Sequence, residues 1–229
     1  MTDPHAGLPP ARRDATALAA GAVVLAHGRG ATPESILAVA DALGRDDLIY
    51  LAPQAAGGSW YPHSFLAPIE ANEPWLSSAV RAVEAAVRAT GLDQAQVALG
   101  GFSQGACLAL ETAARLGGRW AGVFAWSGAL IGTGPGPADA PPLAGMGGRY
   151  PDKAFDYGRR LDGAPVLISG SDTDPHIPLA RMRRSADVLR QLGADVDLRV
   201  TPGAGHTVHA GELAAVAEML GAAFPMNQR

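Results

Sequence analysis

The chain has 229 residues, of which 48% are hydrophobic and 17% are charged, and its formal net charge is −4. This composition is typical of a folded protein with a buried core and excludes a disordered chain. The negative net charge excludes the broad basic surface that binds nucleic acid or anionic membranes. We interpret Arg181, Arg183 and Arg184 as the solvent-exposed face of a helix. The single cysteine, Cys107, excludes an intramolecular disulfide and indicates a reducing compartment.

The first residues resemble the start of a secretory signal. Arg12 and Arg13 precede an apolar run at 15–26. Asp14 interrupts that transition, however, and the run leads directly into the motif HGRG at 27–30, which a functional site would need. We therefore expect a cytoplasmic protein with a loose segment at 1–14 and a single domain over 15–229. No apolar stretch reaches the roughly 20 residues that span a bilayer.

From residue 22 onward, short apolar runs alternate with helical patterns. The runs end in glycine, proline or small polar residues, as buried parallel strands do. In one predicted helix, Thr32 is the N-cap and Pro33 lies in the first turn. In chain order we expect a strand at 22–26, a helix at 32–43, a strand at 48–52, a helix at 74–90, a strand at 97–101, a helix at 104–116, strands at 123–127 and 166–170, a helix at 179–192, a strand at 196–200 and a helix at 211–223. This order predicts an α/β fold, with a mostly parallel central sheet and helices on both faces.

Two long stretches do not follow the alternation, namely 53–73 and the glycine- and proline-rich 128–160. Loops of this length in a compact domain are usually functional. Both follow the carboxyl end of a predicted strand, which is the edge where open α/β sheets bind their ligands. Whether 128–160 closes over a site is left open by the sequence.

The stretch GGFSQGA at 100–106 places Ser103 between a predicted strand and a predicted helix. A G-x-S-x-G motif in this setting is typical of a nucleophilic serine on a sharp turn. Gly101 and Gly105 lack a β-carbon and so allow the chain to pack closely on both sides of Ser103. The helix that begins at Gln104 directs its partially positive end toward the same place. We predict that Ser103 is a catalytic nucleophile.

A serine nucleophile needs a base and an acid that orients the base. His206, in PGAGHT, follows the last predicted strand and is the predicted base. The stretch SGSDTDPHIP at 169–178 offers Asp172 and Asp174 as the acid, and the residues leave both open. His209 is an alternative base. No carboxylate lies at the spacing of a zinc-binding helix, so we expect no metal.

The oxyanion of an acyl-transfer reaction needs two backbone donors. We assign one to the N–H of Gln104, directly after the nucleophile, and the other to the N–H of Arg29 in the glycine-containing loop HGRG. We interpret His27 as a structural residue that fixes this loop by hydrogen bonds. Cys107 is interpreted as a small buried hydrophobic residue.

Together, HGRG, GFSQG, DPHIP and GAGH resemble the phospholipase/carboxylesterase family of α/β-hydrolases, which includes acyl-protein thioesterases. The resemblance covers nearly the whole chain from residue 22. It implies an α/β-hydrolase fold with little or no cap, the hydrolysis of carboxylic esters or thioesters, and no cofactor. The family's D-P-x-V-P pattern favours Asp174 as the acid, and its H-G-x-G pattern places an oxyanion donor at Arg29. An S-W-[YF] segment, matched by residues 59–61, implies that Trp60 forms a wall of the substrate cleft.

These observations predict a serine carboxylesterase that acts on small or medium-chain esters through a Ser-His-Asp triad and an acyl-enzyme. The alternative is a lysophospholipase or an acyl-protein thioesterase that uses the same centre. A serine peptidase and a non-catalytic binding protein are less favoured. We expect a small-molecule or lipid ester as the partner, no nucleic acid and no stable membrane insertion, and we leave a homodimer open.

Overall fold

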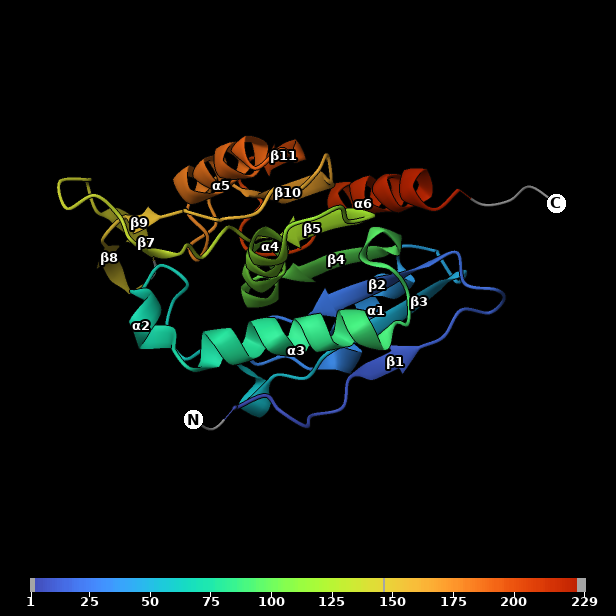
Figure 1. Ribbon diagram of the computed structural model, residues 1–229. Helices are drawn as coiled ribbons and strands as arrows, with labels where there is room; N and C mark the ends of the chain where they lie inside the picture. The colour runs from blue at the N-terminus through green and yellow to red at the C-terminus, as the bar shows by residue number, and fades with distance from the viewer. Residues whose placement is uncertain (1–2, 146, 226–229) are drawn as a thin grey trace.

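The computed structural model describes residues 3–145 and 147–225, and its centre is a seven-stranded sheet (Figure 1). The strand order is β1-β3-β2-β4-β5-β10-β11, and all neighbours are parallel except β1 and β3. The strands are β1 (Ala11–Arg13), β2 (Gly21–Ala26), β3 (Leu48–Ala52), β4 (Val97–Phe102), β5 (Gly122–Trp126), β10 (Pro165–Ser171) and β11 (Asp195–Thr201). Each central strand is a nearly continuous apolar run because both faces of the sheet are covered.

Helices cover both faces of the sheet. The helices α3 (Trp75–Ala89), α4 (Gln104–Leu116) and α5 (Leu179–Gln191) contribute to one apolar cluster, and α1 (Pro33–Asp41) and α6 (Ala210–Ala223) contribute to the other. In Figure 1, α3 lies in front of the strands, and the strand arrows of β2 and β4 point toward the end that carries α2 (Ile69–Asn72). The predicted mostly parallel sheet with helices on both faces is confirmed.

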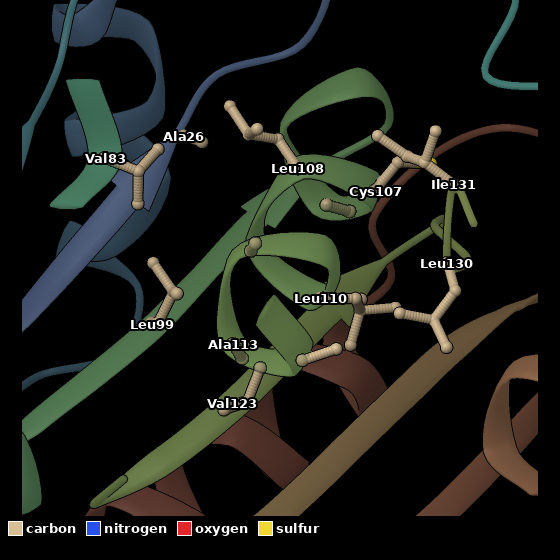
Figure 2. Packing of buried hydrophobic residues seen from close by; sticks show 14 of the residues in the cluster. Ala26, Val83, Leu99, Cys107, Leu108, Leu110, Ala113, Val123, Leu130 and Ile131 are labelled. Carbon is tan, nitrogen blue, oxygen red and sulfur yellow. The ribbon is translucent and has the colours of Figure 1, made fainter. Parts of the chain in front are cut away.

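Helix α4 is enclosed by the core, and every residue from Gln104 to Ala114 is buried. Figure 2 shows Leu108 and Leu110 of this helix among side chains from α3, β4 and β5. A helix that is surrounded on all sides cannot shift without repacking its neighbours. The turn that precedes α4 is therefore held firmly from the helix side.

One buried charge in α4 anchors the start of the long segment 128–160. Glu111 accepts hydrogen bonds from the Nε of Arg115 and the hydroxyl of Tyr157, each at 2.7 Å, and from the N–H groups of Ile131 and Gly132. A buried carboxylate is tolerated when it is paired and hydrogen-bonded in this way.

The segments at 53–73 and 128–160 contain only short elements. The first holds the 3-10 turn Ala56–Gly58 and α2 (Ile69–Asn72), and another 3-10 turn, Gln94–Gln96, precedes β4. The second holds two small antiparallel ribbons, β6 (Gly134–Pro135) with β9 (Lys153–Ala154) and β7 (Leu143–Gly145) with β8 (Gly148–Tyr150). The buried Lys153 joins the two segments, since its Nζ donates to the carbonyl of Phe65 at 2.7 Å.

The N-terminal residues differ from the expectation of a loose segment. Residues 11–13 form the edge strand β1, and His5 is buried, with its N–H donating to Ser78 Oγ at 2.9 Å. The short polar sequence of β1 carries no hydrophobic alternation, so its pairing with β3 is set by the neighbouring strand.

The interpretation of the arginine cluster is wrong for one member. Arg181 is only 2% exposed, because its guanidinium lies 5.0 Å from the ring centre of Phe155 and 3.6 Å from Asp152, whereas Arg183 and Arg184 are exposed.

Within the described residues, no helix combines the length and apolar character needed to cross a membrane.

Candidate active site

Ser103 lies on the turn between β4 and α4, with φ 55° and ψ −118°. A positive φ is uncommon for a residue with a side chain and marks local strain, which typically occurs at functional turns. The Ser103 N–H donates to the carbonyl of Trp126 at 2.9 Å, which holds the strained turn against β5.

The glycines around the turn are required by close backbone packing. A β-carbon at Gly105 would lie 2.1 Å from the carbonyl oxygen of Ala26, and one at Gly101 would lie 2.5 Å from the same atom. Since both contacts are with main chain, no side-chain movement could relieve them. The G-x-S-x-G spacing therefore reflects the approach of α4 to the end of β2.

A chain of hydrogen bonds runs from Ser103 through His206 to Asp174. The Oγ of Ser103 is 2.8 Å from Nε2 of His206, and Nδ1 of His206 is 2.7 Å from Oδ2 of Asp174. Because a carboxylate only accepts, Nδ1 of His206 donates to Asp174, and Nε2 is left to accept from the serine hydroxyl. The loops that carry Asp174 and His206 follow β10 and β11, at the same edge of the sheet as the turn.

The carboxylate of Asp174 is shielded from solvent, and its second oxygen accepts from the N–H groups of His176 at 2.8 Å and Ile177 at 3.0 Å. Burial by itself raises the pKa of Asp174. The hydrogen bonds from His206 and from the two amides outweigh burial, so the pKa lies below its ordinary value. Asp174 is therefore ionised at neutral pH.

The alternatives that the sequence left open occupy different positions. Asp172 accepts a hydrogen bond from the N–H of Gly203 at 2.8 Å and so shapes the loop before His206. His209 precedes α6, where its N–H donates to Glu212. Of the two aspartates, the structure places Asp174 against His206. In the part of the chain that the structure describes, no group of three or more His, Cys, Asp or Glu side chains is arranged to hold a metal ion.

The loop HGRG lies directly beside the nucleophile turn. A β-carbon at Gly28 would be 3.7 Å from the β-carbon of Ser103. Arg29 and Gln104 both line the cleft that contains Ser103. Among the described residues, no acceptor is found for the N–H of either residue. Unpaired amides at a helix N-terminus and in an adjacent loop can stabilise an oxyanion.

The cleft around Ser103 has a volume of about 530 Å³. Its large apolar lining residues are Tyr61, Phe65, Phe102 and Ile177. The polar lining residues include Arg29, His63, Gln104, His176 and His206. A mostly apolar cleft with a few placed polar groups is typical of a small-molecule site.

The structure contradicts the predicted place of Trp60. This side chain is completely buried, and its Nε1 donates to the carbonyl of His27 at 2.8 Å, so it supports the HGRG loop from behind. The next residue, Tyr61, lines the cleft instead. The motif located the correct segment, but adjacent side chains of an extended chain point to opposite sides.

The side chains of Arg29 and Gln104 hold the segment 55–63, which forms one side of the cleft. Gln104 accepts from the Trp60 N–H at 3.0 Å and donates to the Tyr61 carbonyl at 2.8 Å. The guanidinium of Arg29 donates to Ser59 Oγ and to the carbonyls of Pro62 and His63 at 2.8–3.0 Å. The two residues expected to supply the oxyanion donors therefore also fix the wall of the cleft through their side chains.

Two buried histidines support this wall from behind. His27 accepts from the Ala55 N–H at 3.2 Å through Nε2, and its Nδ1 is 2.8 Å from the carbonyl of Gly28, as expected for a structural residue. His5 accepts from the Ala56 N–H at 3.0 Å, and its Nε2 is 3.0 Å from the carbonyl of Trp60. Burial lowers the pKa of both histidines, so both are neutral at neutral pH.

Sequence reasoning missed three residues near the centre. His5 lies in the segment expected to be loose, and no spacing pattern connects it to Trp60. Phe102 and His176 flank the imidazole of His206, with ring centres 5.0 and 4.6 Å away. The available signal was their position in the sequence, since Phe102 directly precedes Ser103 and His176 is two residues after Asp174.

Comparison with known proteins places this arrangement in a family. A model of the family described as phospholipase/carboxylesterase matches residues 14–137. Acyl-protein thioesterase 1 of Gibberella zeae is 28% identical over 138 residues, which cover 59% of this chain and 52% of that protein. The chain thus spans about half the length of this curated relative.

Solved structures are similar over nearly the whole chain. A phospholipase/carboxylesterase from Dyadobacter fermentans superposes with a TM-score of 0.80 at 33% identity, and the match covers 93% of this chain and 96% of that one. A carboxylesterase from Bacillus cereus has a TM-score of 0.67 at 18% identity over 96% of each chain, which supports the fold alone. The protein therefore belongs to the phospholipase/carboxylesterase family of α/β-hydrolases.

Proposed function

We propose that the protein is a serine carboxylesterase that hydrolyses small or medium-chain carboxylic esters through an acyl-enzyme. The observation that carries this proposal is the hydrogen-bonded chain from Ser103 through His206 to Asp174, which opens into a cleft beside two unpaired amides. Nucleophile, base and orienting acid within hydrogen-bond reach are the requirements for activating a serine hydroxyl.

In the proposed mechanism, Nε2 of His206 takes the proton of Ser103 as Oγ attacks the ester carbonyl. The N–H groups of Arg29 and Gln104 stabilise the tetrahedral oxyanion, and the N-terminal end of α4 adds its partial positive charge. Protonated His206 then gives its proton to the leaving alcohol. A water molecule, activated by His206 in the same way, releases the acid and restores the serine. Asp174 holds the imidazole tautomer and stabilises its charged form.

A lysophospholipase or an acyl thioesterase is the second candidate, because the sequence relative named above is an acyl-protein thioesterase. The chemistry at Ser103 would be the same, and only the acyl or leaving group would differ. The cleft volume of about 530 Å³ lies within the range of small-molecule sites. A cytoplasmic location also stays a prediction.

The test is hydrolysis of p-nitrophenyl esters, from acetate to palmitate, by the wild-type protein, Ser103→Ala and Ser77→Ala. Ser77 lies on α3, where its hydroxyl donates to Glu73, and serves as the matched serine control. We expect Ser103→Ala to lose about 10⁶-fold in kcat and Ser77→Ala to stay near wild type. The optimum chain length then separates a short-chain esterase from a long-chain lipid hydrolase. Equal hydrolysis by wild type and Ser103→Ala would contradict the proposal.

A further inference from the structure

The guanidinium of Arg29 is held by three hydrogen bonds, which use three of its five N–H donors. An arginine has five N–H donors in one plane. Nη1 donates to Ser59 Oγ at 2.9 Å and to the Pro62 carbonyl at 3.0 Å, and Nη2 donates to the His63 carbonyl at 2.8 Å. These three bonds leave the Nε–H and one N–H of Nη2. Among the described residues, no carboxylate lies within ion-pair distance of Arg29.

Nε and Nη2 lie side by side on one edge of the planar guanidinium, and each keeps one N–H that makes no bond among the described residues. Such an edge matches the two oxygens of a carboxylate, which arginine binds through two parallel hydrogen bonds. The other three bonds hold the group in place, so little side-chain entropy would be lost when an anion binds. Arg29 is also exposed, which leaves this edge open to a ligand.

Arg29 lies at the catalytic cleft. It lines the same cleft as Ser103, and it follows Gly28, which packs beside the β-carbon of Ser103. Its own N–H is one of the two proposed oxyanion donors. A group bound to its side chain would therefore be only a few bonds from the scissile carbonyl.

The described residues that line the cleft include a positive charge and no carboxylate. Among the described residues that line it, none is an aspartate or a glutamate, and Arg29 is the arginine among them. The nearby carboxylate of Asp174 is shielded and already satisfied by His206 and two amides. A cleft with one uncompensated cation attracts anionic ligands.

We propose that the natural substrate is an ester that also carries a carboxylate, which the free edge of Arg29 binds while Ser103 attacks the ester carbonyl. This inference rests on the proposed esterase function and specifies its substrate class. The carboxylate belongs either to the acyl part or to the alcohol part of the ester, and the two cases are separated by experiment. The competing explanation is that Arg29 serves only to fasten the segment 55–63.

The experiment compares anionic and neutral esters of similar size by titrating the acid released. For the acyl side, monoethyl glutarate is compared with ethyl hexanoate. For the alcohol side, 3-acetoxypropionate is compared with butyl acetate. Each ester is tested with wild type, Arg29→Met, Arg29→Lys and Ser59→Ala. Ser59→Ala loosens the same segment by removing an acceptor of Arg29 without changing the charge.

We expect the wild-type protein to favour the anionic ester of one pair in kcat/KM. Arg29→Met should lower this ratio by about 10- to 100-fold, which corresponds to the loss of hydrogen bonds to a charged group. Arg29→Lys should keep part of the ratio because it keeps the charge, and Ser59→Ala should leave the ratio near its wild-type value even if both rates fall. Added salt should lower the wild-type ratio because Arg29 is exposed.

The proposal is overturned if Arg29→Met slows both members of each pair equally, since that is the effect of a fastening residue. It is also overturned if wild type favours the neutral ester in both pairs. Failure of the esterase function itself gives a different result, in which no ester is hydrolysed or Ser103→Ala hydrolyses the neutral esters as fast as wild type.

Discussion

The two sides of the cleft around Ser103 are built in different ways. The turn at Ser103 is formed by adjacent residues of the chain, in which β4 ends, Ser103 adopts a strained conformation and α4 begins. The opposite wall, segment 55–63, has little regular structure of its own. Residues far away in the sequence hold it in place, namely His5, Arg29 and Gln104.

This difference predicts how each side responds to substitution. At the turn, one backbone clash or one lost charge acts directly on the reacting atoms. At the wall, several hydrogen bonds share the same task, so the loss of one of them should have a graded effect.

The largest effect after loss of the nucleophile is expected from Asp174→Asn. An asparagine cannot hold His206 in the tautomer that accepts from Ser103, so kcat should fall about 10⁴-fold. Asp172→Asn is the matched control, because Asp172 lies on the same loop as Asp174 but accepts a hydrogen bond from Gly203 instead of His206. It should cost less than about 10-fold. Steady-state kinetics on a short-chain ester measure both variants. A larger loss in Asp172→Asn than in Asp174→Asn would reverse the assignment of the acid.

Gly105→Ala should damage the turn through main-chain contacts. The new β-carbon would lie 2.1 Å from the Ala26 oxygen and 2.5 Å from the His27 oxygen, so α4 and the HGRG loop must move apart. We expect a loss of about 1–3 kcal/mol in the free energy of unfolding and at least a ~100-fold loss in kcat/KM, since small misplacements of reacting groups are costly.

The control for that substitution is Gly221→Ala in α6, where nothing lies within 4 Å of the added β-carbon. An alanine in place of this helical glycine should stabilise the protein by up to about 1 kcal/mol and leave activity unchanged. Urea unfolding together with ester hydrolysis measures both properties. A fully active Gly105→Ala protein would show that the close approach of α4 is not needed.

A smaller effect is expected on the other wall from Gln104→Ala. This variant keeps the backbone N–H of residue 104 but removes the side-chain bonds to Trp60 and Tyr61. Because Arg29, His27 and His5 still hold the segment, kcat/KM should fall only about 10-fold, less than the 10²–10³-fold cost of losing an oxyanion donor.

Gln94→Ala is the control, since Gln94 also donates to a main-chain carbonyl, that of Gly117, away from the cleft. Both variants should lower the free energy of unfolding by roughly 1 kcal/mol, but only Gln104→Ala should slow ester hydrolysis. Equal kinetics of the two variants would mean that the wall needs no support from Gln104.

The difference between the turn at Ser103 and the wall at 55–63 also explains which features could be predicted from the sequence. Apart from β1, the strands of the central sheet and the helices that cover it were predicted to within one or two residues, because their apolar periodicity and caps are local signals. One example is the helix at 104–116. The turn at Ser103 is likewise marked by a local signal, the G-x-S-x-G motif. Asp174 and His206 follow the ends of strands that the alternation of apolar runs and helical patterns locates. Their catalytic roles stay a prediction.

What the sequence did not show depends on contacts between distant residues. The edge strand β1 is three residues long and polar, and its pairing with β3 depends on the existing sheet. The direction of Trp60 depends on the carbonyl of His27, and the burial of Arg181 depends on Phe155 and Asp152. No local pattern encodes these partners, so motif and periodicity place the segments but not their side chains.

The smallest predicted effect concerns the pH dependence of stability and involves His5, which lies behind the wall of the cleft. Burial lowers the pKa of His5, and this effect outweighs the opposing ones of the Trp60 carbonyl and Asp3. Between its folded-state pKa and the unfolded value near 6.5, the unfolded chain binds more protons than the folded protein. The stability that neutral His5 contributes is therefore complete above about pH 6.5 and is lost as the pH falls toward the folded-state pKa.

His5→Gln keeps a donor and an acceptor but does not titrate. The difference in unfolding free energy between wild type and this variant should shrink as the pH falls from 7.5 to 5, by at most about 1.4 kcal/mol per pH unit. His27, whose pKa is lowered chiefly by burial and least by His5, is present in both proteins, so most of its contribution cancels in the difference. Urea unfolding at several pH values measures this difference. A difference that is constant with pH would contradict this prediction, because it would show that the pKa of His5 is the same in the folded protein as in the unfolded chain.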